Sequence, residues 1–209
     1  MDIEQFENAV HGLASALGQD WTATTDDREC RRSIGRGQLR RKDGAELHLM
    51  ERWKDRRMIR VSCVWPRFHQ HVFDPKACSL VEHGTKDLEM NFRADRDAAR
   101  VCAEVRRRVL CDYLTLLPLC VEYRDDKVAS YRSLLAEVKQ LGDEGQLRRH
   151  SAEPRFGEEL ALSQYGSEGV SSNYRVSPWS RSARIELTSV PMSLAKQIAK
   201  LVQKHNATG

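Results

Sequence analysis

Two short windows of the sequence concentrate basic side chains that could bind an anionic partner. Residues 28–42 hold seven basic residues and one acidic residue, and residues 52–60 hold five basic residues and one acidic residue. An arginine guanidinium binds a phosphate or a carboxylate through two parallel hydrogen bonds, and an aromatic ring provides a surface on which a base can stack. The candidate binding residues are Arg31, Arg32, Arg36, Arg40, Arg41, Lys42, Trp53, Lys54, Arg56 and Arg57.

The charge distribution makes the two windows stand out from the rest of the chain. The formal net charge of all 209 residues is only +4, so the sequence outside the windows is acidic. Such polarity favours an anionic partner on one face of the molecule. The alternative is a charged sheet edge that only prevents aggregation. The pattern leaves open whether the partner offers phosphates or protein carboxylates.

A second group of potentially reactive residues lies in one predicted loop: Cys63, His69, His71, Cys78 and His83. Their thiols and imidazoles could bind zinc, but the spacing lacks the closely spaced pairs that structural zinc sites use. Ordinary loop residues are the preferred interpretation over an enzyme that uses this loop with a metal, and no metal or other cofactor is predicted.

Motifs for catalysis are absent from the sequence. There is no G-x-S-x-G, Walker or H-E-x-x-H motif, and Gly35-Arg-Gly37 lacks the remaining glycines of a dinucleotide fingerprint. The adjacent acids Asp125-Asp126 and Glu158-Glu159 point in different directions on a regular element, so neither pair converges on one substrate atom. The sequence therefore predicts a binding protein and no enzyme.

The composition is that of a folded globular protein. Hydrophobic residues make up 40% and charged residues 31%, and the longest apolar stretch, 113–121, is too short to span a membrane. The first residues are acidic and amphipathic, unlike a secretory signal. The six cysteines form no C-x-x-C pair, so reduced thiols and a cytoplasmic location are expected.

Hydrophobic periodicity predicts an α+β fold. A helix at 3–17 ends at Gly18, and strands at 37–42, 45–53 and 58–65 form an antiparallel meander that turns at Asp43-Gly44. With Leu47 and Leu49 buried, His48 and Met50 should face solvent. A fourth strand follows at 88–92.

Helices dominate the middle of the chain. One helix is predicted to begin at Asp95, with Glu104 pairing with Arg100 or Arg108, and a further helix covers 126–141. The glycine-rich and charged segment 142–158 is predicted to be a linker. The sequence thus predicts two domains. Residues 1–145 hold the first helix, the sheet and the helical region. Residues 146–209 form a small αβ unit whose strands at 159–165, 170–176 and 183–188 precede a helix at 191–205, with Leu194, Ile198, Leu201 and Val202 inward.

One stretch is similar to known sequences. The segment Ile59-Arg-Val-Ser-Cys-Val-Trp-Pro66, followed by Phe73-x-Pro75, Arg96-x3-Arg100 and Arg107-Arg-Val-Leu-Cys-Asp-Tyr113, resembles uncharacterised accessory proteins of phages, plasmids and integrated mobile elements. The resemblance covers about a quarter of the chain and implies a setting in which small proteins handle nucleic acid or disable host defences.

These observations lead to two expectations for function. The first is a non-catalytic, anti-CRISPR-like inhibitor, which occupies or disrupts a host protein or ribonucleoprotein complex. The alternative is an accessory factor that binds the DNA or RNA backbone. In either case reversal of Arg31, Arg32, Arg40 and Arg41 is predicted to abolish binding, and reversal of Arg100 and Arg107 is predicted to leave binding nearly unchanged.

Overall fold

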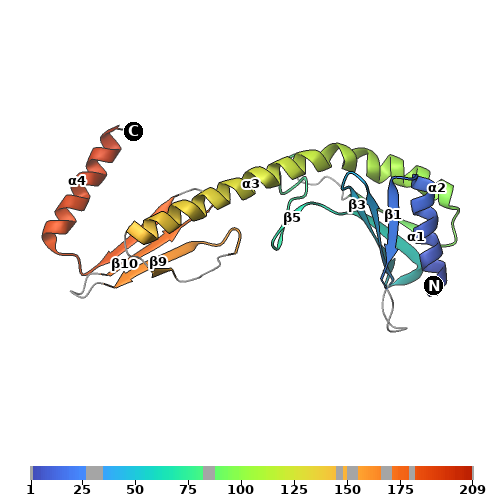
Figure 1. Cartoon of the computed structure of the whole chain (residues 1–209), viewed down its shortest axis with the longest axis horizontal. Coiled ribbons are helices and arrows are strands. Elements are labelled where there is room, and N and C mark those ends of the chain that lie inside the picture. The colour runs from blue at the N-terminus through green and yellow to red at the C-terminus, as the bar shows by residue number, and fades with distance from the viewer. Residues whose placement is uncertain are drawn as a thin grey trace. The chain divides into compact units, whose positions relative to one another are not determined.

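A computed structural model describes residues 2–26, 35–81, 88–144, 148–149, 155–165, 171–178 and 182–208 (Figure 1). The chain divides into two compact units, Met1–Asp126 and Lys127–Gly209. One helix, α3, contributes residues to both units. The predicted domain boundary at residue 145 stays a prediction about which parts of the chain fold on their own.

The first unit is built on a five-stranded antiparallel sheet, and the predicted α+β class is confirmed. Its strands follow one another in the order β1 (Trp21–Thr25), β2 (Arg36–Arg41), β3 (Glu46–Arg52), β4 (Asp55–Cys63) and β7 (Glu89–Arg93). The last four match the predicted strands. Strand β1 was not predicted; it is a short strand rich in threonine that occupies the sheet edge. A small hairpin, β5 (Arg67–Phe68) with β6 (His71–Val72), lies in the following loop.

The predicted hairpin turn at Asp43-Gly44 is present between β2 and β3. Gly44 adopts a φ of 93°, which favours glycine because it has no Cβ to clash. The Asp43 Oδ1 atom accepts a hydrogen bond from the Ala45 N–H at 3.3 Å. This turn fixes the register in which Leu39 lies opposite Leu47.

Helix α1 (Ile3–Leu17) covers the apolar face of this sheet. Asp2 caps it by accepting a hydrogen bond from the Gln5 N–H at 2.7 Å, and Gly18 ends it with a φ of 113°, as the sequence predicted. Gly37 lies against this helix, and a Cβ there would be 3.1 Å from a Val10 methyl group, so Val10 would have to shift by a few tenths of an ångström to admit it. The core is thus closely packed at this position.

A long helical region follows the sheet without a break. Helix α2 (Ala98–Val105) runs through a π-helical turn (Arg106–Leu110) into α3 (Cys111–Glu144). Residues 126–141 are helical as predicted, but they do not form a separate helix, since α3 begins at Cys111 and continues through Pro118. The predicted start at Asp95 was wrong. Asp97 caps α2 by accepting a hydrogen bond from the Arg100 N–H at 3.0 Å.

The second unit contains a smaller sheet in the order β11-β10-β9-β8. Its strands are β8 (Arg148–Arg149), β9 (Leu160–Tyr165), β10 (Ser171–Val176) and β11 (Ala183–Thr188), and β8 was not predicted. Leu134 and Val138 of α3 form a core cluster with side chains of β9 and β10. The Tyr131 hydroxyl donates to the Arg155 carbonyl oxygen at 3.1 Å and so ties α3 to the segment before β9.

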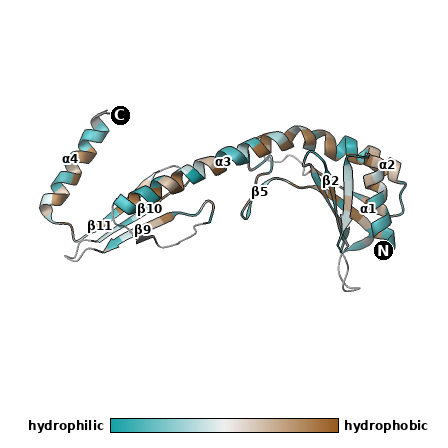
Figure 2. Ribbon diagram, in the orientation of Figure 1, coloured by the Kyte–Doolittle hydropathy of each residue, from teal (hydrophilic) through white to brown (hydrophobic). Residues whose placement is uncertain are grey.

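Helix α4 (Met192–Thr208) is the last described element, and its apolar side is open. The expectation that its apolar residues point into a core was wrong. Leu194, Leu201 and Val202 are 38%, 67% and 53% exposed. Figure 2 shows hydrophobic and hydrophilic residues interspersed along this helix. In the described part of the chain, no helix is long and apolar enough to cross a membrane.

Candidate anion-binding face of the sheet

The five-stranded sheet has one buried face and one open face. Leu47, Leu49, Ile59 and Val61 are almost completely buried, whereas the intervening His48 and Met50 are exposed as predicted. Alternation along each strand assigns the remaining side chains to a face. The open face carries five arginines: Arg36, Arg40, Arg52, Arg60 and Arg93.

The predicted basic residues lie at two opposite ends of the β2–β3–β4 strands. Arg40, Arg41 and Lys42 flank the turn at Gly44, and we call this set the Gly44 end. Arg36, Arg52, Trp53, Lys54 and Arg57 lie at the other end of the same strands, and we call this set the Trp53 end. The antiparallel register keeps the two sets apart, since Arg40 pairs with Glu46 and Arg36 pairs with Met50.

Each described cation of the Gly44 end already has an acidic partner. Arg40 Nε lies 3.0 Å from Glu46 Oε2, and Lys42 Nζ lies 3.1 Å from Asp20 Oδ1. Arg41 forms an ion pair with Asp43, and its hydrogen bond lowers the pKa of the Asp43 carboxyl to about 2. Binding a further anion here would compete with these pairs.

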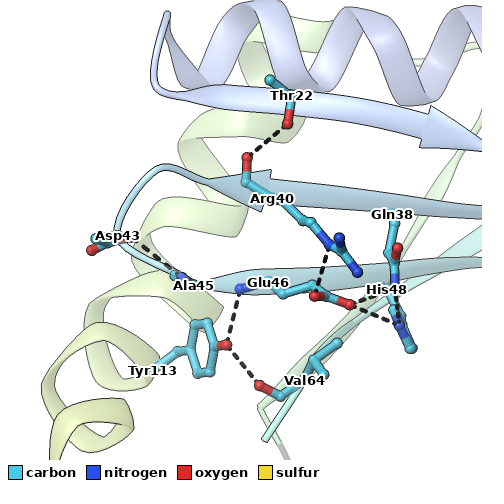
Figure 3. A network of polar contacts seen from close by, with 9 residues as sticks. All are labelled: Thr22, Gln38, Arg40, Asp43, Ala45, Glu46, His48, Val64 and Tyr113. Atoms are coloured by element: carbon cyan, nitrogen blue, oxygen red, sulfur yellow. Dashed lines mark hydrogen bonds and ion pairs between the residues drawn. The ribbon is translucent and has the colours of Figure 1, made fainter. Parts of the chain in front are cut away.

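Polar contacts around Glu46 extend this network across the strands (Figure 3). Glu46 Oε1 accepts a hydrogen bond from the Gln38 side-chain amide and lies 3.3 Å from His48 Nε2. The Gln38 Nε2 atom is 2.9 Å from the same histidine nitrogen. Glu46 therefore engages side chains from two strands, and the Gly44 end is close to electrostatically neutral.

The Trp53 end is different because three of its four cations lack such partners. Arg36, Arg52 and Lys54 are exposed and have no ion pair with any residue that the structure describes. Arg57 lies 4.0 Å from Asp55 and its side chain is 80% exposed. Trp53 is 68% exposed in the turn between β3 and β4. Unpaired cations beside an exposed indole can contact phosphate and base together.

The first basic window also reaches the Trp53 end. Asp26 and Gly35 lie there, because the Asp26 N–H donates to the Arg36 carbonyl oxygen at 3.1 Å and the Gly35 N–H donates to Glu51 Oε2 at 3.1 Å. Arg31 and Arg32 fall in the segment 27–34, outside the described residues, as does the side chain of Arg56. Four of the ten predicted site residues lie together at the Trp53 end: Arg36, Trp53, Lys54 and Arg57.

Three arginines of the open face were not among the predicted site residues: Arg52, Arg60 and Arg93. Arg60 forms an ion pair with Glu89, and Arg93 NH2 lies 2.6 Å from Asp95 Oδ2. The Arg93 hydrogen bond lowers the pKa of the Asp95 carboxyl. Arg93 lies outside both basic windows, and only the alternation of the strand at 88–92 could have placed it on the open face.

One arginine beside α2 is also paired. Arg96 NH2 lies 2.6 Å from Glu104 Oε1, so the predicted pairing of Glu104 with Arg100 or Arg108 was wrong. Arg96 precedes α2, and its side chain extends along the first turns of α2 to the Glu104 carboxylate. The hydrogen bond from Arg96 lowers the pKa of Glu104. The pairing leaves Arg100 and Arg107 exposed on the helix surface.

The cysteine and histidine loop forms no metal centre among the described residues, where no group of three or more His, Cys, Asp or Glu could hold an ion. His83 lies outside the described residues. Cys78 and Cys120 are buried neighbours, and burial raises the pKa of Cys120 to about 12. Burial likewise raises the pKa of the Cys63 thiol to about 12. Such thiols are poor nucleophiles at neutral pH.

A cavity lies beside β4 and α3 in the first unit. Its volume is about 470 Å³, and its apolar wall includes Trp65 and Leu116. Three carboxylates, from Asp74, Glu89 and Asp112, also line it. Three carboxylates against the one ammonium group of Lys76 disfavour an anionic ligand in this cavity. No protein-family model, curated protein or solved structure matches this chain.

Proposed function

We propose that the protein is a non-catalytic binding protein whose Trp53 end engages a single-stranded nucleic acid. One observation carries this proposal: three of the four cations of the Trp53 end, Arg36, Arg52 and Lys54, lack carboxylate partners among the described residues, whereas those of the Gly44 end are paired. Phosphates would bind Arg36, Arg52 and Lys54, and an unpaired base would stack on Trp53.

The open sheet face supports a single strand better than a duplex. A stacking aromatic residue needs bases whose faces are accessible, and a duplex covers those faces. No described helix rises from this face to enter a major groove, because α1 packs against the opposite, apolar face. His48, Gln38 and Asn91 on the open face would offer additional hydrogen bonds to bases or sugars.

The biological setting is a further part of the proposal. The resemblance to mobile-element accessory proteins favours action in the cytoplasm on a host nucleoprotein defence complex, with the Trp53 end contacting the nucleic acid of that complex. In the anti-CRISPR-like form of this proposal the protein binds the assembled complex only. In the accessory-factor form it binds naked DNA or RNA.

Fluorescence anisotropy with labelled single-stranded DNA and RNA tests the proposal. We expect binding to both, with log K falling as log salt rises by a slope of about −0.7 for each phosphate contacted. Binding to a purified CRISPR nucleoprotein complex without binding to the free strands would support the inhibitor form. An absence of binding to free strands and to the complex at about 50 mM salt would refute the Trp53 end as a nucleic-acid site.

A further inference from the structure

The second unit leaves one long sheet edge and one helix face open. In the order β11-β10-β9-β8, strand β11 is an edge strand of six residues, whereas β8 at the other edge has two. An edge strand presents unpaired N–H and C=O groups at every second residue. Nothing in the described part of the second unit pairs with β11 on that side.

Burial falls steeply across this sheet toward β11. The register places Leu162, Tyr174 and Ile185 side by side in one row across β9, β10 and β11. Leu162 is 1% exposed beneath α3, Tyr174 is half-buried and Ile185 is 54% exposed. The apolar row therefore continues past the area that α3 covers, and it ends at the open edge.

We propose that two copies of the chain pair antiparallel through β11 and join their sheets into one continuous sheet. The paired edges would satisfy the open backbone groups, and the row would run from Leu162 through Ile185 into Ile185 and Leu162 of the second copy. A second copy fits this edge because the strand is complementary to itself, as its side-chain charges show.

Among two-fold axes at the three residues Arg184, Ile185 and Glu186, charge favours one register. Directly opposed residues of two antiparallel strands share a face, so a two-fold axis must pass beside one residue of β11. An axis at Arg184 would oppose two arginines, and an axis at Glu186 would oppose two glutamates. An axis at Ile185 places Arg184 of each copy opposite Glu186 of the other, which gives two ion pairs between the copies. Within each copy, Arg184 and Glu186 already lie 2.9 Å apart.

Helix α4 supplies the apolar surface needed to cover the seam. Leu194, Ile198, Leu201 and Val202 recur at helical spacing on one side, and Lys196, Lys200 and Lys204 recur on another. Only 189–191 separate β11 from the helix, so α4 starts beside the seam. An anionic membrane or an acidic protein could also bind such a helix, but neither would account for the open edge and the exposed Ile185.

Charge exchange tests the register in the full chain. Light scattering after size-exclusion chromatography should report a dimer for the natural sequence. Arg184→Glu and Glu186→Arg should each weaken dimerisation at least about fivefold, because each creates two like-charge pairs. The two variants mixed together should form a heterodimer, and the double exchange R184E/E186R should restore the homodimer. Far-UV circular dichroism of each variant checks that it stays folded.

Crosslinking and helix variants complete the test. Ile185→Cys should form an intermolecular disulfide on mild oxidation, whereas Ala183→Cys should not, since its copies would lie about 13 Å apart. Leu201→Glu should weaken the dimer at least about tenfold, and the matched change Gln203→Glu should leave it within about twofold. A chain that stays monomeric at about 100 µM overturns the proposal. So does a dimer that is indifferent to the charge exchange, or an Ala183→Cys disulfide that forms as readily as the Ile185→Cys one.

Discussion

The hydroxyl group of Tyr113 donates a hydrogen bond to the carbonyl oxygen of Val64 at 2.7 Å and accepts one from the Glu46 N–H at 3.1 Å. Tyr113 is completely buried, and its ring meets Trp65 edge to face with centroids 5.0 Å apart. Burial raises the pKa of its phenol, so the hydroxyl stays protonated and able to donate. This side chain joins α3 to the start of β3 and the end of β4.

Replacement of Tyr113 by phenylalanine should therefore destabilise the fold. The change leaves a carbonyl and an N–H without their partner, which costs about 1–3 kcal/mol in the free energy of unfolding. Tyr174→Phe is the matched control, because the structure describes no hydrogen-bond partner for that hydroxyl, and it should change the free energy by less than about 0.5 kcal/mol. Urea denaturation measures both. Equal effects of the two changes would argue against the role assigned to Tyr113.

Neutralising the unpaired cations should weaken nucleic-acid binding more than neutralising the paired ones. We expect R36Q/R52Q to reduce the salt slope for a single strand by about 1.4, because two phosphate contacts are lost. R40Q/K42Q removes the same charge, but those two cations already pair with Glu46 and Asp20, so the slope should stay nearly unchanged. Anisotropy titrations at several salt concentrations measure the slopes. A larger loss for R40Q/K42Q would place the site at the Gly44 end.

Removal of the exposed indole should lower affinity without changing the salt slope. Stacking of one base contributes about 1–3 kcal/mol, so Trp53→Ala should weaken binding roughly tenfold or more. Trp53→Phe should recover part of this loss, because a phenyl ring still stacks. Trp53 is 68% exposed, so neither change should lower the melting temperature appreciably. An unchanged affinity in Trp53→Ala would remove the stacking role and leave only phosphate contacts.

Alkaline pH should destabilise the fold through its buried thiols. Burial raises the pKa of Cys63 and of Cys120 from 9.0 to about 12, so between these pH values the folded state holds protons that the unfolded state has lost. The stability that these thiols contribute is fully present below pH 9.0 and is lost as the pH rises toward about 12.

Urea denaturation from pH 8 to about 11 measures this dependence. The unfolding free energy should decline less steeply with pH in C63A/C120A than in the natural sequence. Cys111→Ala serves as the control, since that thiol is already exposed in the folded chain, and it should keep the natural slope. An unaltered slope in C63A/C120A would show that other groups cause the alkaline loss.

Much of the secondary structure follows from the sequence alone, because its signals are local. Alternation at Leu47 and Leu49 and the Asp43-Gly44 turn predicted the hairpin, and both are present. The start of a new helix near 126 was predicted incorrectly, since α3 runs through Pro118 without a break. Side chains of α3 pack into a core cluster in each unit, and this packing stabilises the continuous helix. Helix ends depend on such packing as well as on local propensity.

The candidate site was only partly accessible to sequence reasoning. The arginines and Trp53 were predicted as site residues because they lie in the two basic windows, and the sequence by itself determines those windows. Which cations remain available depends on strand register and on contacts between distant residues, such as Lys42 with Asp20 and Arg40 with Glu46. Coulomb attraction acts over a few ångströms in space, whatever the separation along the chain. Only the tertiary structure could therefore distinguish the paired Gly44 end from the open Trp53 end.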